Sequence, residues 1–189
     1  MLAASLSSHG VELITTREPG GTPLGEKLRE AFLETNESIS PMAELLAFAA
    51  DRAQHVEFLI RPSLAKGLIV ISDRFADATY AYQGAGRGFP EDKILQVIDL
   101  ATGGLKPDLT IFLDIPVNTA TRRMASRDES LSVKNRMDEE NAGFYTRVRD
   151  AYRGIAEREP HRFVIIDATG SVDEIHEKVV QKVRAVIER

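Results

Sequence analysis

Charged side chains lie next to glycines in residues 17–22, which read REPGGT and directly follow an apolar run. Turn chemistry accounts for the proline, the glycines and Thr22, which can cap the following helix that carries Arg29. It does not account for the neighbouring charges of Arg17 and Glu18. The segment is therefore a candidate for ligand binding, with an ordinary turn as the alternative.

A second pair of opposite charges, Asp73 and Arg74, ends another apolar run and is followed by Phe75. A carboxylate at the end of a strand can hold a magnesium ion through water, and an adjacent arginine can bind two phosphate oxygens at once. This combination suits phosphoryl transfer. A surface ion pair at the end of a strand is the alternative.

An aromatic ring and a guanidinium share one face of a predicted helix, because Phe48 and Arg52 are four residues apart. The ring can stack on a nucleobase while the arginine donates hydrogen bonds to its carbonyl edge. A core phenylalanine beside an arginine that extends to water is the alternative.

Two further segments carry groups that could contact a nucleotide. Residues 80–88 (YAYQGAGRG) combine aromatic, amide, glycine and arginine groups, and could line a nucleoside pocket or form a flexible loop. Residues 126–140 are crowded with charges, and a closing lid there could bring positive charge to a transferring phosphate. A solvated charge run is the alternative. The basic residues in or beside this predicted lid are Arg123, Arg127, Lys134 and Arg136.

The elements that would position these groups alternate between apolar runs and helical patterns. The runs are continuous, as expected for strands buried on both faces of a parallel sheet. They cover residues 11–16, 68–72, 109–113 and 163–166. Helical periodicity spans residues 41–65 and recurs near the C-terminus, where Ser171 and Glu174 form a possible capping box. Since the carboxyl ends of parallel strands share one edge, Glu18 and Asp73 should meet there.

Length and composition indicate one soluble globular domain, and the alternation of strand and helix patterns makes it an α/β protein. The chain has 189 residues, a formal net charge of −5 and no cysteine, which excludes disulfides, thiolate zinc sites and a cysteine nucleophile. No apolar run reaches the roughly 20 residues that span a bilayer, and the N-terminus lacks the pattern of a signal peptide. We therefore expect a cytoplasmic protein that acts on a small molecule, with neither nucleic acid nor membrane as a partner.

A phosphate-binding loop of the form GxxxxGK[ST] does not occur in the 189 residues, and neither does GxGxxG. Residues 1–8 have the pattern of the second half of a helix that ends at His9 and Gly10, where glycine suits the C-terminal cap. A strand pattern follows at once. The sequence thus predicts a chain that begins inside an element.

Taken together, the motifs resemble those of bacterial thymidylate kinases, in the family's order and over nearly the whole chain. The resemblance rests on residues 17–22 (REPGGT), 50–55 (ADRAQH), 73–75 (DRF), 81–84 (AYQG) and 101–108 (ATGGLKPD). It implies a three-layer nucleoside monophosphate kinase fold of the P-loop NTPase type, with a parallel sheet and flanking helices in one domain over residues 1–189. The implied activity is phosphorylation of dTMP to dTDP by a homodimer that uses ATP and Mg²⁺.

The resemblance also implies roles for individual residues. Phe48 would stack on thymine, and Arg52 would donate to its carbonyl edge. Arg29 and Arg74 would hold the dTMP phosphate, and Asp73 would lie close to the magnesium ion. The other residues implied at the dTMP site are Glu18, Pro19, Thr79, Tyr82 and Gln83. The catalytic groups implied near the transferred phosphoryl group are Arg74, Asp73, Arg123 and Arg136.

The same resemblance implies that the family's first strand, its glycine-rich phosphate loop and the first half of a helix are missing at the N-terminus. The 189 residues would then bind ATP poorly, because backbone N–H groups and a lysine of that loop hold the ATP phosphates. Two alternatives are another nucleoside monophosphate kinase and a non-catalytic dTMP-binding remnant. Asn135 stands where many relatives carry aspartate before the lid arginine.

Overall fold

Parallel strands form two separate pairs in the computed structural model, which describes residues 1–35, 37–125, 137 and 140–188. The pairs are β1 (Leu13–Arg17) with β2 (Ile69–Asp73), and β3 (Thr110–Asp114) with β4 (Phe163–Asp167). Each predicted strand is confirmed within two residues of its expected bounds. The continuous apolar runs therefore identified the strands and their parallel direction.

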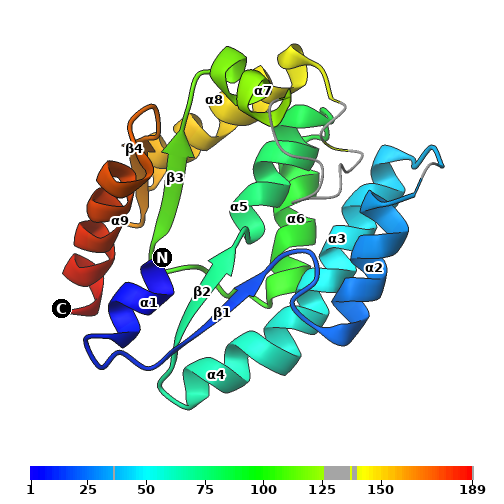
Figure 1. Cartoon of the computed structure of the whole chain (residues 1–189). Helices are drawn as coiled ribbons and strands as arrows, with labels where there is room; N and C mark the ends of the chain where they lie inside the picture. The colour runs from blue at the N-terminus through cyan, green and yellow to red at the C-terminus, as the bar shows by residue number, and fades with distance from the viewer. Residues whose placement is uncertain (36, 126–136, 138–139, 189) are drawn as a thin grey trace.

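Helices flank the strand pairs (Figure 1). Those that the structure describes are α1 (Leu2–Ser7), α2 (Pro23–Leu33), α3 (Pro41–His55), α4 (Arg61–Ala65), α5 (Ala76–Thr79), α6 (Glu91–Thr102), α7 (Val117–Ala125), α8 (Ala142–Arg158) and α9 (Val172–Ile187), with π-helical segments η1 (Val56–Ile60) and η2 (Tyr80–Gly86). Helix α3 packs between α2 and α6, whereas α8 and α9 contact β4. None of these helices is both long and apolar enough to cross a bilayer.

Local sequence explains where several helices begin and bend. The Thr22 side chain caps α2 by accepting a backbone N–H, and Ser171 and Glu174 form the predicted capping box at α9. The helix predicted over residues 41–65 is continuous but changes its hydrogen-bond register in η1, just before Pro62, because proline has no N–H to donate to the preceding turn. Gly10 has a φ of +79°, as expected for a glycine after α1.

Residues Tyr80–Gly86 form the helical segment η2, so the flexible-loop alternative for this region is wrong. The segment packs against α8, and a Cβ on Gly86 would lie only 2.6 Å from Cε2 of the Phe144 ring. Arg147 of α8 donates to the carbonyls of Ala85 and Gly86 at 3.1 and 2.8 Å. Tertiary contact with α8 therefore holds this glycine-rich stretch in a helix.

Arg162, directly before β4, connects the two halves of the fold. Its guanidinium donates to both carboxylate oxygens of Asp77 in α5, at 2.8 and 2.9 Å, and to the Thr110 hydroxyl at the start of β3, at 3.2 Å. A third nitrogen donates to Glu159 at 2.6 Å. The Arg162 side chain is only 9% exposed, so this cluster is a buried ionic contact between the half that contains β2 and the half that contains β3 and β4.

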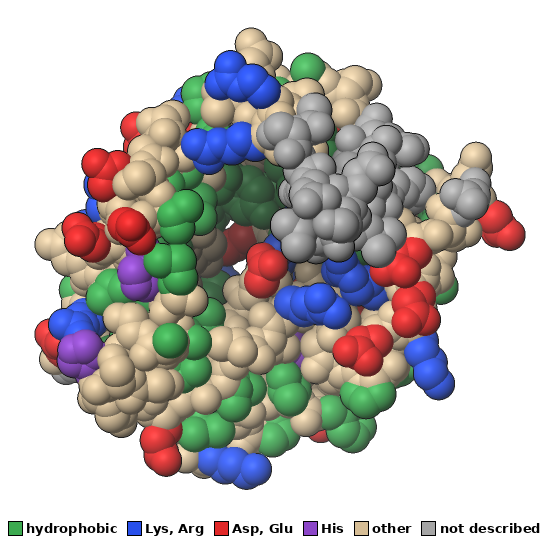
Figure 2. All heavy atoms as spheres, viewed as in Figure 1, with side chains coloured by type: hydrophobic (Ala, Val, Ile, Leu, Met, Phe, Trp, Pro, Cys, Tyr) green, Lys and Arg blue, Asp and Glu red, His purple; other side chains and the backbone are tan. Residues whose placement is uncertain are grey.

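A hollow separates the two strand pairs. Within the described residues, β2 pairs only with β1 and β3 pairs only with β4. Leu113 of β3 and Ile165 of β4 remain 47% and 42% exposed, whereas strands of a parallel sheet are normally covered on both faces. Figure 2 shows the surface hollowed near the centre of this face, with hydrophobic side chains in its wall. The single parallel sheet that the sequence predicts is therefore present as two parallel pairs, because no described strand bridges them.

Candidate functional site

The carboxyl ends of β1 and β2 form the edge at which the two predicted charged segments meet. The Glu18 N–H donates to the Asp73 carbonyl at 2.9 Å, and Arg17 lies opposite Asp73 in the strand register. The next residue, Arg74, has a φ of +69°. A left-handed backbone at a bulky residue costs roughly 1–3 kcal/mol, and such strain concentrates at functional sites. The prediction that the two segments share one edge is confirmed.

Two arginines lie against the loop that follows β1. The Arg29 guanidinium of α2 donates to the Pro19 carbonyl at 3.3 Å. Gly20 has a φ of +109°, and a Cβ there would lie 3.3 Å from Cδ of Arg29 and 3.4 Å from Nε of Arg17. Glycine at this position therefore permits both the turn and the close approach of two positively charged side chains, as a phosphate-binding edge requires.

Aromatic side chains form a wall beside this edge. The guanidinium carbon of Arg74 lies 4.8 Å from the centroid of the Tyr82 ring. Phe48, Tyr82 and Tyr152 are partly buried and pack against the same core cluster. Tyr152 also stacks on Phe112, with ring centroids 4.7 Å apart, and burial raises the pKa of its phenol, which therefore stays protonated. Tyr152 was not among the predicted site residues.

Arg52 lies at the centre of a buried hydrogen-bond network, with only 3% of the residue exposed. Its Nε donates to Oε2 of Glu18 at 2.8 Å, and its two terminal nitrogens donate to the Thr79 hydroxyl at 2.7 Å and the Phe75 carbonyl at 3.2 Å. The other Glu18 oxygen lies 2.8 Å from Nδ1 of His55. The structure thus brings together three predicted site residues, and it adds the backbone of Phe75 and the ring of His55.

Gln83 belongs to a second buried network, centred on Glu44. The carboxylate of Glu44 is fully buried and accepts from Nε2 of Gln83 at 2.9 Å. Arg87 donates to both Glu44 oxygens at 3.0 and 2.9 Å and also pairs with Glu140 at 2.6 Å. Sequence reasoning missed Glu44, although it lies one helical turn before Phe48 and therefore on the same face of α3. That spacing was the available signal.

The structure does not bring Arg123 to this edge. Its guanidinium donates at 3.2 Å to the carbonyl of Ala168, in the connection between β4 and α9. The predicted lid over residues 126–140 lies outside the described residues, apart from Met137 and Glu140. The basic residues predicted in that segment, Arg127, Lys134 and Arg136, all lie outside as well. Among the described residues, no group of three or more histidines, cysteines and carboxylates could hold a metal ion by itself.

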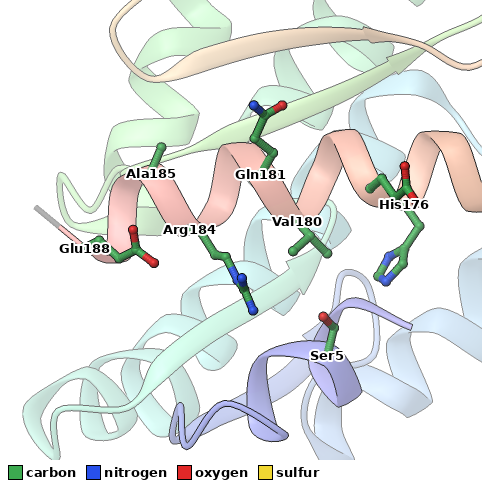
Figure 3. A pocket seen from close by; sticks show the side chains of 8 residues that line it. Ser5, His176, Val180, Gln181, Arg184, Ala185 and Glu188 are labelled. Carbon is green, nitrogen blue, oxygen red and sulfur yellow. The ribbon is translucent and has the colours of Figure 1, made fainter.

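Two hollows of the described chain lie away from the edge. One, of about 550 Å³, is a shallow groove between α1 and α9, where Ser5 faces His176, Val180 and Arg184 (Figure 3). The other, of about 380 Å³, lies beside α6 and includes Tyr80 in its wall. Neither is lined by a predicted site residue. The convergence of arginines, buried carboxylates and aromatic rings therefore marks the β1–β2 edge as the candidate site.

Known proteins with similar sequences and structures identify the family. Residues 1–179 match the family model described as thymidylate kinase. A thymidylate kinase from Pseudomonas putida (strain GB-1) is 42% identical over 100% of this chain and 88% of its own length. One from Trichlorobacter lovleyi is 46% identical over 89% of this chain and 81% of its own length. The crystal structure of thymidylate kinase from Ehrlichia chaffeensis covers 97% of this chain and 88% of that one, with a TM-score of 0.75 and 33% identity. Together with the edge geometry, these matches show that the chain belongs to the thymidylate kinase family, phosphotransferases with an α/β nucleoside monophosphate kinase fold.

Proposed function

We propose that the β1–β2 edge is the acceptor site, which binds dTMP for phosphorylation by ATP. The observation that carries this proposal is the buried guanidinium of Arg52, held by Glu18, Thr79 and Phe75 one helical turn after Phe48. A guanidinium has five N–H groups, and three of Arg52's donate to these acceptors. The other two contact no acceptor among the described residues, so they are free to donate to a base.

Phe48 and Arg52 together recognise thymine. The ring of Phe48 stacks on the base, and Arg52 donates to the O4 carbonyl. Thr79 and Gln83 lie beside the base, each already held by one protein hydrogen bond, to Arg52 and to Glu44 respectively. Cytosine presents an amino group where thymine presents O4, so Arg52 favours dTMP over dCMP. A site built around such a hydrogen bond strongly penalises a base that lacks it.

The dTMP phosphate binds between Arg29 and Arg74, with Pro19 and Tyr82 lining the sugar. Its attacking oxygen is already ionised, so the reaction needs no side-chain base. Catalysis then consists of positioning and of charge stabilisation by Arg74 together with the lid arginine Arg136. Glu18 supports the pocket without contacting dTMP through its carboxylate, because Arg52 and His55 already donate to the two carboxylate oxygens.

Asp73 fits a magnesium ion, because its exposed carboxylate follows the strand edge and, among the described residues, has no ion-pair partner. Mg²⁺ usually keeps several waters and takes one or two carboxylates plus substrate phosphate oxygens, which matches a single acidic side chain. When bound, the ion would neutralise charge on the transferring phosphoryl group. Asp73 would hold it at the end of β2, next to Arg74.

The ATP phosphates bind a strand and glycine-rich loop that are not among these 189 residues. The unpaired edges of β2 and β3 and the hollow between them support this proposal, because one further parallel strand there would join both pairs into a five-stranded sheet. The helix α9 is amphipathic yet has no buried residue, which is consistent with an underfilled centre. The 189-residue chain should therefore bind dTMP but form negligible dTDP.

The active form of the enzyme is a homodimer in the cytoplasm. Met42 and Leu46 share one face of α3 and are 51% and 54% exposed, and Phe58 in η1, the segment that continues α3, is 67% exposed. An apolar face of this kind on a soluble enzyme indicates a protein contact. Light scattering tests it, since Leu46→Glu should convert a dimer to a monomer, whereas a wild-type monomer at micromolar concentration would contradict the proposal.

Calorimetry with dTMP tests the acceptor site directly. Arg74→Ala should weaken dTMP binding at least about tenfold, since one charge-assisted phosphate contact is removed. Arg158→Ala is the matched control, because that arginine pairs with Tyr80 and Glu91 away from the edge. Equal affinity in the wild-type and Arg74→Ala proteins would contradict the assignment.

Turnover separates the remaining alternatives. A coupled assay with dTMP, dUMP, CMP and GMP, on a version of the chain that carries a phosphate loop, distinguishes a thymidylate kinase from another nucleoside monophosphate kinase. In that version Arg74→Ala should lower kcat about 10²- to 10³-fold, the usual cost of removing one preorganised donor. Absence of turnover with every acceptor, despite dTMP binding, would favour a non-catalytic dTMP-binding remnant.

A further inference from the structure

We infer that His55 is a positioning residue for base recognition, which sets the Arg52 guanidinium through the carboxylate of Glu18. This inference rests on the proposed acceptor site and adds to it a residue that does not touch the substrate. The three side chains form one line of hydrogen bonds in the buried space between the β1 edge and α3.

Both nitrogens of the His55 ring are engaged, and the residue has no exposed surface. Nδ1 lies 2.8 Å from Oε1 of Glu18, and Nε2 lies 2.7 Å from the Thr16 hydroxyl. Because a carboxylate only accepts, Nδ1 donates to Glu18, and Nε2 shares a hydrogen bond with the Thr16 hydroxyl. The ring is therefore fixed at both ends, one in strand β1 and one in the loop that follows it.

Glycines make room for this arrangement. A Cβ on Gly21 would overlap the His55 ring and the Thr16 hydroxyl, and a Cβ on Gly25 would overlap the carboxylate of Asp51. Asp51 lies one turn before His55 on α3 and accepts the Gly20 N–H at 3.1 Å. Two successive turns of α3 thus dock against residues 20–25, which form the loop after β1 and the first turn of α2, and both contact points require small residues.

Glu18 transmits the constraint because it uses one oxygen for His55 and the other for Arg52. Held by His55, the Glu18 carboxylate cannot rotate, so it presents Oε2 to Nε of Arg52 in one plane. The plane of a guanidinium fixes the directions of all five N–H groups. When the guanidinium plane is fixed, the two remaining N–H groups of Arg52 point toward the base site before the base binds. Binding then does not have to order the Arg52 side chain, so less conformational entropy is lost on binding.

Two substitutions of His55 separate this role from simple core packing. The amide of His55→Asn can replace Nδ1 and still donate to Glu18, whereas the longer His55→Gln places its amide near the position of Nε2, toward Thr16. We expect His55→Asn to keep the ratio of dCMP to dTMP dissociation constants within about threefold of wild type. We expect His55→Gln to lower that ratio roughly 10-fold or more, as loss of one charge-assisted contact does.

Thermal melts of both variants provide the control. If the His55 ring only fills space, both substitutions should lower the melting temperature and neither should change the ratio of dCMP to dTMP dissociation constants. That result would overturn the inference. Should His55→Gln fail to fold, Glu18→Gln serves as the second variant, since it interrupts the same line at the next side chain. An unchanged ratio in Glu18→Gln would equally overturn the inference.

A readout without substrate distinguishes failure of this inference from failure of the acceptor site. In the ¹⁵N-labelled full chain, the Nε–H resonance of Arg52 should exchange slowly with water and should shift in His55→Gln but not in His55→Asn. If the wild-type chain does not bind dTMP, the acceptor site is wrong whatever the resonance shows. If it binds dTMP and the Arg52 resonance is the same in all three proteins, only the positioning role is wrong.

Discussion

Replacing Arg52 by methionine keeps most of the side-chain volume but removes three hydrogen bonds from a site that is almost closed to water. The acceptors left behind are Oε2 of Glu18, the Thr79 hydroxyl and the Phe75 carbonyl. Glu18 is 5% exposed, so water cannot replace the lost guanidinium. We expect a large loss of stability, caused mainly by the charge on Glu18 that remains buried.

The magnitude follows from the state of Glu18. Breaking a buried ion pair by removing one partner costs about 3–5 kcal/mol. His55 still contacts the other Glu18 oxygen at 2.8 Å, so we expect the lower end, about 3 kcal/mol. For a chain of this length, each kcal/mol lowers the melting temperature by roughly 2–4 °C. Arg52→Met should therefore melt about 6–12 °C below wild type.

A double-mutant cycle measures the electrostatic part. Glu18→Gln combined with Arg52→Met removes both charges, so the double variant should be more stable than the sum of the single losses by about 1–3 kcal/mol. Urea unfolding of the four proteins gives the coupling free energy. A loss below about 1 kcal/mol for Arg52→Met, or additivity within about 0.5 kcal/mol, would refute the view that Glu18 is a charge held mainly by Arg52.

Two further predictions concern packing and pH. Gly86→Ala should cost about 1–3 kcal/mol, because the added methyl group meets the Phe144 ring of α8. Gly154→Ala, within α8 itself, has nothing within 4 Å and should be neutral or stabilising by up to about 1 kcal/mol, so equal melting temperatures of the two variants would contradict this prediction. The hydrogen bond from Arg162 lowers the pKa of Glu159 below its ordinary 4.5, so this contact stabilises the fold above that pH and is lost as the pH falls through the lowered value. Melts from about pH 6 to pH 3 should therefore fall less steeply for Glu159→Gln than for wild type.

Sequence reasoning located the strands because burial on both faces leaves a strong signal in the sequence. The runs at residues 68–72 and 109–113 contain little but apolar residues, and each strand begins and ends one residue later than expected. The meeting of Glu18 and Asp73 at one edge was predicted from the parallel direction of the two strands alone. The hydrogen bond from the Glu18 N–H to the Asp73 carbonyl confirms it. Pattern and topology were sufficient wherever the position of a side chain followed from its strand.

Buried polar networks could not be predicted in the same way. Nothing in the local sequence shows that His55 reaches Glu18, since the two are 37 residues apart and meet only when α3 docks on the loop. The spacing of charges near residue 123 indicated a role at the phosphate, yet the described side chain of Arg123 contacts the carbonyl of Ala168. Partner choice among polar groups depends on tertiary geometry, which spacing along one chain does not contain.

The groups proposed to bind dTMP lie on α2, α3, α5 and η2 and in the connections that follow β1 and β2, and α8 supplies the wall beside them. Helix α2 contacts α3, and η2 contacts both α5 and α8. None of the hydrogen bonds described for the site crosses the hollow between β2 and β3. The buried contact of Arg162 with Asp77 holds the other half in place without a shared strand. The proposed acceptor site therefore depends on hydrogen bonds such as Arg52 to Glu18 and Gln83 to Glu44, none of which spans the hollow.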